Sequence, residues 1–446
     1  MDKSYYKILF ISFFFFLYVD SFAQKFNLLG GKDSYKTSFK LINNLIVIPV
    51  EVNGTKLTFI LDSGVKSAVI FNLSSSDSLE INHVEKIFIR GLGDGEPIEA
   101  LHSKGNRFKM GNLFSTNNDL YIVHKEKLDF SAKLGITVHG LIGYDLLKDF
   151  VVTVDYSHKK ITFTKPEKYK YKKCRNCETF DLEFYKNKPY INAEVTVIEP
   201  YNKTIPVKLL IDSGGTDSVW LFEDDNIQIP QKSFRDFMGE GISGSIYGMR
   251  SKLKSFALKK FVFKEPNVAY LDSASSLHAR KFKGRNGSIG GNILKRFKII
   301  FDYPNSKITL KKNDNFNDSF GYNLSGIELM HAGQELVKQQ NSTAFTISKG
   351  SSSIGSENSV VFDYNYKYEF KPLYSIFQVR KDSPSEISGV EVGDTLIKIN
   401  GIYVYNYTLQ QLIEKFHGKN NRTVKLVVNR NGQQLKFEFK LKDILQ

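Results

Sequence analysis

The stretch Leu209-Leu210-Ile211-Asp212-Ser213-Gly214-Gly215 decides the predicted fold of this 446-residue chain. An apolar run of this length predicts a strand with both faces covered, so the Asp at its end is carried toward the protein interior. An earlier stretch, Phe59-Ile60-Leu61-Asp62-Ser63-Gly64, repeats the pattern almost residue for residue. Because an unpaired charge in the interior is unfavourable, each Asp needs a compensating partner.

The simplest partner for Asp62 is Asp212. Two carboxyl groups brought together cannot both stay ionised, so they share one proton and titrate as a unit. One of them then takes a proton from a water molecule while the other donates a proton to the group under attack. A single Asp-Ser-Gly is equally well explained as a turn, since all three residues favour turns. Two copies, each after an apolar strand, favour a catalytic pair.

The residues that follow the two Asp side chains fit this interpretation. Ser63 and Ser213 carry hydroxyl groups that can brace the two loops against each other. Gly64 and Gly214 allow the two backbones to approach closely, because glycine has no Cβ.

The chain also repeats itself after each Asp loop. Gly140-Leu141-Ile142-Gly143-Tyr144-Asp145-Leu146-Leu147 follows the first loop, and Gly287-Ser288-Ile289-Gly290-Gly291-Asn292-Ile293-Leu294 follows the second. A constant separation of 147 positions (297 − 150 = 147) relates three later pairs of residues, which are Phe150 and Phe297, Asp155 and Asp302, and Ile161 and Ile308. The chain therefore contains an internal duplication.

These motifs resemble aspartic proteases of the retropepsin type, in which an Asp-Thr-Gly or Asp-Ser-Gly loop is followed by an apolar-apolar-Gly segment and a short helix. The resemblance covers residues 41–310, with Ser288 departing from the apolar pattern. It implies a mainly β fold with two duplicated retropepsin-like acid-protease β-barrel lobes, in which Asp62 and Asp212 are the catalytic residues. The viral enzymes take one Asp from each of two subunits, whereas one chain carries both here, as in pepsin-like enzymes.

Two Gly-rich segments stand where this family has flaps, which are mobile covers over the substrate. Gly-rich tips suit a lid that must move and exclude water. Ordinary exposed hairpin tips explain the same composition about as well. The flap candidates are Gly91, Gly93 and Gly95 in the first copy and Gly239, Gly241 and Gly244 in the second.

The N-terminus predicts an export signal. Lys3 and Lys7 precede an apolar run from Ile8 to Val19, and Ser21-Phe22-Ala23 then offers small residues before a cleavage point. The run is shorter than the roughly 20 residues that span a bilayer, which leaves an uncleaved anchor as the alternative. We expect a signal peptide over residues 1–23 and a mature chain without a transmembrane segment, secreted most simply into a periplasm.

The remaining 423 residues (446 − 23 = 423) are enough for about three domains. We expect protease lobe 1 over residues 24–165, a basic linker over 166–180 and protease lobe 2 over 181–312. A C-terminal domain follows over 313–446, with a polar, Ser-rich insertion near 331–368.

The segment between the two copies is strongly basic. Residues 165–177 contain six basic side chains and one acidic side chain, which is a third of the chain's net charge of +15. A solvated linker explains this composition better than a patch for anionic lipid or polysaccharide. The only two cysteines, Cys174 and Cys177, lie here without the βαβ context of a redox pair or enough ligands for zinc. A local structural disulfide is therefore expected in an oxidising compartment.

The C-terminal domain resembles a PDZ domain of the bacterial, permuted kind. The segment Val392-Gly393-Asp394-Thr395-Leu396-Ile397-Lys398-Ile399-Asn400-Gly401 carries the signature, and residues 409–416 have the spacing of a helix that would flank the peptide groove. The resemblance implies a carboxylate-binding loop, in which backbone N–H groups capture a peptide terminus. This loop would consist of Leu324, Ser325, Gly326 and Ile327.

The sequence thus predicts an exported aspartic endopeptidase that acts on peptides or proteins, with a PDZ module that docks substrate or partner tails. No cofactor, metal or nucleic-acid partner is expected, because nothing resembles a phosphate loop or a zinc-binding His pair. The alternative is a binding or adaptor protein that kept the fold without the chemistry. Val65 and Lys66 favour it, because a cation beside Asp62 would oppose proton sharing unless it points to solvent.

Overall fold

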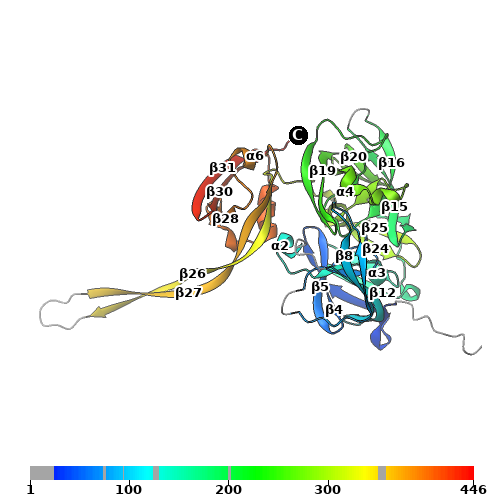
Figure 1. Cartoon of the computed structure of the whole chain (residues 1–446), viewed down its shortest axis with the longest axis horizontal. Helices are drawn as coiled ribbons and strands as arrows, with labels where there is room; N and C mark the ends of the chain where they lie inside the picture. The colour runs from blue at the N-terminus through cyan, green and yellow to red at the C-terminus, as the bar shows by residue number, and fades with distance from the viewer. Residues whose placement is uncertain are drawn as a thin grey trace, which may run out of the picture.

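The chain is described here by a computed structural model. Its described residues are 25–73, 77–93, 95–123, 130–198, 202–349 and 358–445, with side chains described outside 341–365. The predicted signal peptide, residues 1–23, lies outside this set. Two β-rich lobes lie side by side, and a C-terminal domain packs against them (Figure 1). Within the described residues, no helix is long and apolar enough to cross a membrane.

The two lobes contain matching sets of short strands. The elements of lobe 1 are β1 (Asn27–Leu28), β3 (Lys40–Ile42), β4 (Leu45–Val52), β5 (Thr55–Leu61), β6 (Ala68–Ile70), β7 (Val84–Ile89), β8 (Ile98–Met110), β9 (Leu113–Val123), β10 (Gly140–Ile142), α2 (Phe130–Leu134) and α3 (Tyr144–Leu147). Those of lobe 2 are β14 (Glu183–Tyr185), β15 (Lys188–Thr196), β16 (Thr204–Ile211), β17 (Val219–Leu221), β18 (Phe234–Gly241), β19 (Gly244–Lys252), β20 (Ser255–Leu258), β21 (Phe261–Lys264), β22 (Asn267–Leu271), β23 (Gly287–Ile289), α4 (Ser273–Ser276) and α5 (Gly291–Leu294).

Each lobe is organised around one strand that ends at an Asp-Ser-Gly loop. In lobe 1, β5 pairs antiparallel with β4 and parallel with β10. In lobe 2, β16 pairs in the same way with β15 and β23. The last three residues of β5 and of β16 are buried, as expected for a strand that is covered on both faces. The predicted mainly β, duplicated architecture is confirmed.

A sheet built from both copies joins the lobes. Its strand order is β13-β25-β24-β11-β12-β2, and the strands are β2 (Ser34–Ser38), β11 (Val151–Asp155), β12 (Lys160–Thr164), β13 (Cys177–Asp181), β24 (Phe297–Asp302) and β25 (Lys307–Lys312). In the central pair, Thr153 lies opposite Ile300, its own counterpart in the other copy (153 + 147 = 300). The two copies therefore meet as the two halves of a symmetric dimer would, about an approximate two-fold axis.

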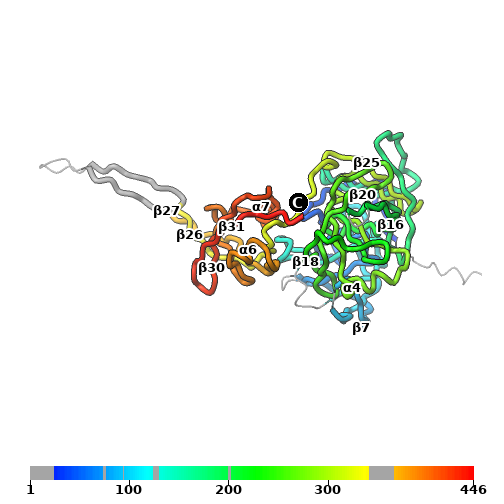
Figure 2. Tube along the Cα trace, turned by 90° about the horizontal axis from the view of Figure 1, so that it is seen from above, coloured from blue at the N-terminus to red at the C-terminus, as the bar shows by residue number. Residues whose placement is uncertain are grey.

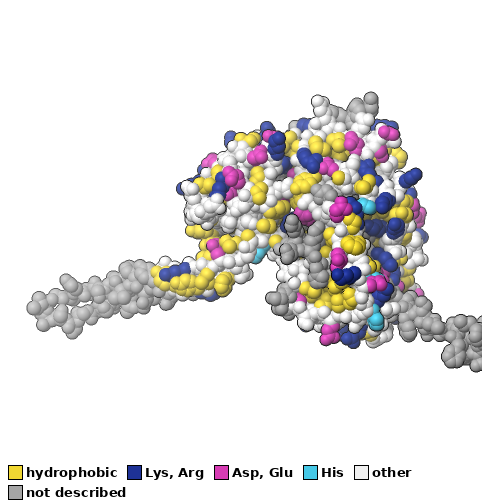
Figure 3. Space-filling view, viewed as in Figure 1, with side chains coloured by type: hydrophobic (Ala, Val, Ile, Leu, Met, Phe, Trp, Pro, Cys, Tyr) yellow, Lys and Arg dark blue, Asp and Glu magenta, His cyan; other side chains and the backbone are white. Residues whose placement is uncertain are grey.

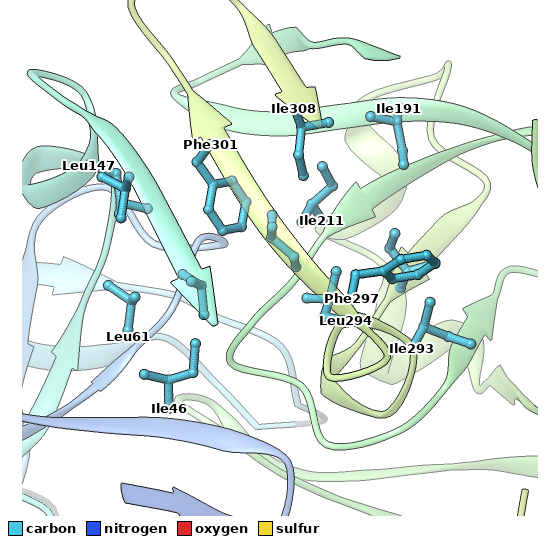
Figure 4. Close-up of a cluster of buried hydrophobic side chains, with 14 of the residues drawn as sticks. Ile46, Leu61, Leu147, Ile191, Ile211, Ile293, Leu294, Phe297, Phe301 and Ile308 are labelled. Carbon is cyan, nitrogen blue, oxygen red and sulfur yellow. The ribbon is translucent and has the colours of Figure 1, made fainter. Parts of the chain in front are cut away.

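The lobes also share one hydrophobic core. Leu61 and Leu147 of lobe 1 belong to the same buried cluster as Ile211 and Ile293 of lobe 2, and Phe301 of the shared sheet lies among them (Figure 4). Burying an aliphatic or aromatic side chain contributes about 1.5–3 kcal/mol. A cluster that extends across the boundary therefore fixes the lobes relative to each other.

The C-terminal domain is a small sheet with two helices. Its elements are β26 (Ile327–Lys349), β27 (Asn358–Val379), β28 (Thr395–Ile399), β29 (Ile402–Tyr403), β30 (Thr423–Arg430), β31 (Gln433–Lys440), α6 (Pro384–Ile387) and α7 (Leu409–Phe416). Helix α7 begins with a capping box, in which the Thr408 side chain accepts from the Gln411 N–H and the Gln411 side chain accepts from the Thr408 N–H. It covers a separate core that contains Ile399 and Phe416.

Two segments predicted from the sequence, the polar insertion and the basic linker, contain strands. Strands β26 and β27 run antiparallel as a ribbon that points away from the lobes (Figures 1 and 2), so the described parts of the insertion expected near 331–368, residues 331–349 and 358–368, extend the sheet. Strand β13 begins at Cys177, inside the segment 166–180 that was expected to be a linker.

Single turns of 3-10 helix lie at Leu29–Gly31, Pro166–Lys168, Ala279–Lys281, Asp314–Asn317 and Val404–Asn406.

Arg296 fastens lobe 2 to the segment that leads into the C-terminal domain. Its guanidinium is fully buried. It donates to the carbonyl oxygens of Asn292 (2.9 Å), Phe316 (3.2 Å) and Asp318 (2.5 Å) and lies 3.8 Å from the Phe320 ring centroid. One side chain thus satisfies several partly buried carbonyl groups.

We expect Arg296→Met to lower the free energy of unfolding by about 2–5 kcal/mol, because several partly buried carbonyl groups lose a charged donor and hydrogen bonds to charged groups contribute about 1.5–3 kcal/mol each. Denaturant or thermal unfolding measures the loss. Lys298→Met is the matched control, since Lys298 pairs with Asp155 at the surface (2.9 Å) and such pairs contribute about 0–1 kcal/mol. Equal losses in the two variants would contradict the structural role of Arg296.

Candidate active site

The two Asp-Ser-Gly loops are joined by reciprocal hydrogen bonds. The Ser63 N–H donates to the Ser213 Oγ (2.9 Å), and the Ser213 N–H donates to the Ser63 Oγ (3.0 Å). The Ser63 hydroxyl donates to the Ile211 carbonyl and the Ser213 hydroxyl to the Leu61 carbonyl, both at 2.7 Å. Each buried hydroxyl both donates and accepts, so neither loop can shift without breaking bonds to the other.

The apolar-Gly segments identified in the sequence lie directly beside these loops. The Asp62 N–H donates to the Ile142 carbonyl (2.8 Å), and the Asp212 N–H donates to the Ile289 carbonyl (3.0 Å). Ser288, which departs from the apolar pattern, is buried on β23 next to β16. Both copies therefore use the same main-chain contacts to fix the Asp backbone.

The two carboxyl groups lie beside each other, since a Cβ on Gly64 would lie 3.1 Å from Asp62 Oδ1 and 3.5 Å from Asp212 Oδ1. Each also accepts from its own loop, Asp62 Oδ1 from the Gly64 N–H (2.7 Å) and Asp212 Oδ1 from the Gly214 N–H (3.1 Å). A Cβ on Gly214 would lie 2.5 Å from Asp62 Oδ2, closer than real Cβ contacts come. Glycine at this position therefore permits the close approach.

Burial raises the pKa of both carboxyl groups. For Asp62, burial acts first and the charge of Asp212 second, and together they raise the pKa to about 7. For Asp212, burial raises the pKa against the opposing positive charges of Arg285 and Lys188. The form in which the pair holds one proton is therefore favoured up to near-neutral pH.

Lys188 and Arg285 are site residues that the sequence analysis did not select. Lys188 interacts electrostatically with both Asp62 and Asp212, and Arg285 interacts with Asp212. The Arg285 Nε also donates to the Gly287 carbonyl (3.0 Å). Lys66, the cation that the sequence analysis considered, is exposed at the cavity lining, and its charge is not among those that shift the pKa of Asp62 or Asp212. The positive charge beside the pair therefore comes from lobe 2.

The tips of two hairpins meet, β7–β8 from lobe 1 and β18–β19 from lobe 2. The N–H of Gly91 donates to the Ser243 Oγ (2.9 Å), and the N–H of Gly95 donates to the Ser243 carbonyl (2.9 Å). The Ser243 N–H donates to the Leu92 carbonyl (3.0 Å). Ser243 and Leu92 were not selected from the sequence, although each lies between predicted glycines.

The flap-candidate glycines are needed for this contact. A Cβ on Gly241 would lie 2.0 Å from the Leu92 carbonyl oxygen, and one on Gly93 would lie 2.6 Å from the Gly244 nitrogen. Gly239 and Gly244 adopt φ values of +131° and +124°, which side chains disfavour. The two tips therefore approach as bare backbone.

A cavity of about 720 Å³ contains the carboxyl pair. It is lined by residues of both hairpin tips, including Gly91 and Gly241. Its size falls within the range of ligand-binding clefts, which is about 300–1,000 Å³. The C-terminal domain contributes to the wall as well, through Glu328, Leu329, Phe377 and Ile413.

The C-terminal domain braces the second hairpin. The Phe377 ring lies 5.7 Å from the Phe237 ring, and Arg380 pairs with Asp236 (3.8 Å). The Nζ of Lys133, on α2 of lobe 1, lies 4.7 Å from the Phe377 ring centroid. All three parts of the chain therefore meet at the base of β18.

The predicted carboxylate-binding loop is buried, and its N–H groups are engaged within the domain. The N–H groups of Ser325 (3.0 Å) and Gly326 (3.1 Å) donate to the Asn323 Oδ1, and the Ile327 N–H donates to the Ser325 Oγ (3.0 Å). The Leu324 N–H donates to a carbonyl at the end of α7 (2.9 Å). A peptide carboxylate would have to displace these internal acceptors.

Cys174 and Cys177 form a disulfide, with their Cα atoms 5.6 Å apart. It lies at the start of β13, on the approach to lobe 2. Among the described residues, no group of three or more His, Cys, Asp or Glu side chains is arranged to hold a metal ion.

Comparison with known proteins identifies two domains. Residues 48–146 match a family model described as aspartyl protease, and residues 376–430 match one described as PDZ domain. A comparison with curated proteins gave no match. Among solved structures, the aspartic proteinase from Irpex lacteus is similar with 12% identity and a TM-score of 0.41, over 64% of this chain and 99% of that one. The chain thus carries an aspartyl protease domain followed by a PDZ domain, as its sequence predicted.

Proposed function

We propose that this protein is an aspartic endopeptidase in which Asp62 and Asp212 jointly activate the attacking water. The observation that carries the proposal is that two Asp-Ser-Gly loops, joined by the Ser63 and Ser213 hydrogen bonds, bring the Asp62 and Asp212 carboxyl groups together in the cavity beneath the hairpin tips. The aspartyl protease match to residues 48–146 supports it.

The proposed reaction needs one proton on the pair. The ionised carboxylate accepts a proton from water as the water oxygen attacks the peptide carbonyl carbon, and the other carboxyl donates its proton to the carbonyl oxygen. The resulting diol collapses when one of its hydroxyl protons returns to a carboxylate. The C–N bond then breaks, and the leaving nitrogen receives a proton. The pair ends with one proton, so the cycle is balanced.

The PDZ domain is proposed to present peptide substrate or partner segments to the cleft. Its residues Phe377 and Ile413 line the cavity wall, which supports direct contact with a bound chain. Export to a periplasm-like compartment is also proposed, on the N-terminal signal pattern and the Cys174–Cys177 disulfide.

A protease-fold binding protein remains the second candidate, because Lys188 and Arg285 oppose protonation of Asp212. Burial outweighs these charges and still raises the pKa of that group. The variants below separate the two functions.

We expect Asp62→Asn and Asp212→Asn each to lower peptide cleavage by about 10²–10⁴-fold, since each removes a general acid or base. Cleavage of a peptide library followed by mass spectrometry measures the effect. Asp181→Asn, an exposed carboxylate outside the cavity, is the control. Cleavage that survives either active-site substitution would assign the activity to other residues.

We expect kcat/KM to fall as pH rises through about 7, the pKa of Asp62, because the pair then loses its shared proton and no acid remains. Initial rates on one peptide across the pH range measure this limb. A rate that keeps rising beyond about pH 9 would rule out a shared proton as the acid.

The buried carboxyl also predicts a pH-dependent stability. Asp62 has a pKa of 3.8 when exposed and about 7 in the folded protein. Its contribution to the free energy of unfolding is therefore fully present below pH 3.8 and is lost as pH rises through about 7. Asn does not titrate, so the free energy of unfolding of Asp62→Asn is expected to rise by a few kcal/mol relative to that of the parent protein as the pH increases between these limits. Melting temperatures at a series of pH values measure the difference. A constant difference would contradict the raised pKa.

A further inference from the structure

Four cationic side chains of lobe 2 line the cavity. They are Lys186, Lys188, Lys281 and Arg285. In the described part of the chain, none of the four forms a salt bridge, whereas the nearby Lys208 is paired with Glu183. With one shared proton, the carboxyl pair would supply a single negative charge against these four positive charges. The lobe 2 side of the cleft is therefore strongly positive.

The rest of the cavity does not offset this charge, and its lobe 1 lining adds Lys66, Arg90 and Lys133. Glu240 is paired with Lys133 (2.5 Å), and burial followed by the charge of Asp236 raises the pKa of Glu328 to about 7. On the face shown in Figure 3, Lys and Arg side chains are spread over both lobes. A peptide that enters the cleft thus meets a positive field, and the charges of Lys188 and Arg285 act directly on Asp212.

Lys188 and Arg285 are held in position by the strands that flank β16. The pairing of β15 with β16 ends at Tyr190 and Leu210, each two residues from Lys188 and Asp212 respectively, and the charge of Lys188 acts on Asp212. Arg285 is fixed by its Nε bond to the Gly287 carbonyl (3.0 Å), on the strand that pairs with β16. Burial lowers the pKa of both cations, which shows that water stabilises their charges incompletely.

The duplication provides an internal comparison for both positions. Val47 pairs with Ile60, so the register in lobe 1 sets Leu45 across from Asp62 (45 + 62 = 47 + 60). The constant separation of 147 relates Arg285 to Val138 (285 − 147 = 138). Leu45 and Val138 are buried aliphatic residues. The fold therefore does not require cations at these places, and lobe 2 alone carries them.

We propose that Lys188 and Arg285 form an anion subsite that binds a carboxylate of the peptide substrate beside Asp212, opposite an apolar wall in lobe 1. The inference rests on the proposed peptidase function and names its substrate class, a peptide with an acidic group on one side of the scissile bond. The apolar wall includes Leu45, Val69 and Leu141, so an apolar residue is expected on the other side. The carboxylate comes either from an Asp or Glu side chain or from the substrate's C-terminus.

The test begins with a peptide library that maps the cleavage sites of the full chain. Synthetic peptides that differ only by Glu or Gln at the selected position are then compared by kcat/KM. We expect the Glu peptide to be favoured by about 10- to 100-fold, the usual range for hydrogen bonds to charged groups. A C-terminally amidated version distinguishes the sources, because amidation removes the preference only if the terminal carboxylate is bound.

The double variant Lys188→Leu and Arg285→Val replaces each cation by the aliphatic residue of the corresponding position in lobe 1, Leu45 or Val138. This variant is expected to lose the Glu preference, while Lys208→Leu, a cation outside the cavity lining, keeps it. Lys188→Glu is expected to shift the preference toward a Lys peptide, a gain that misfolding cannot produce. Equal cleavage of the Glu and Gln peptides by the parent protein, or a preference that survives the double substitution, would overturn the subsite.

Failure of the proposed function would look different. If the parent protein cleaves no peptide in the library, the peptidase proposal fails, and fluorescence anisotropy of the labelled Glu and Gln peptides decides the subsite. Tighter binding of the Glu peptide that the double substitution abolishes would sustain the subsite. Equal binding of the two peptides would overturn it.

Discussion

Crossed hydrogen bonds between Ser63 and Ser213 hold two acidic loops at one point inside the protein. Each such bond contributes only about 0.5–1.5 kcal/mol net. Two carboxyl groups brought together with little access to water are more unfavourable than that unless they share a proton. The rest of the fold must therefore keep the loops together, and it does so through the sheet and the core that both lobes share.

The sequence was sufficient for the parts of this arrangement that depend on local patterns. An apolar strand, its Asp loop and the apolar-Gly segment are each readable over a few residues, and their repetition identified Asp62 and Asp212 as a pair. The residues that were missed depend on pairing between distant segments. Lys188 lies 24 positions before Asp212 (212 − 188 = 24), and only the register of β15 with β16 relates the two. Ser243 acts through a hairpin tip of the other lobe.

The PDZ prediction shows the same limit. The motif at residues 324–327 was readable, but the Asn323 side chain that accepts from its N–H groups carries no sequence signal of its own. Nor did the sequence indicate that this domain would contact β18. Domain contacts of this kind depend on surface shape and charge, and these emerge only after each domain has folded.

The near-symmetric joint between β11 and β24 has a consequence for any attempt to divide the chain. Separated halves would each expose one of these strands at a sheet edge. Because the β11–β24 pairing is nearly symmetric, two copies of the same half could pair through it almost as well as the two different halves do. A dimer of two second halves would contain the Lys188 and Arg285 pair twice, and a dimer of two first halves would lack it. Because one polypeptide contains both halves, the first half always pairs with the second, and the two sides of the cleft therefore differ.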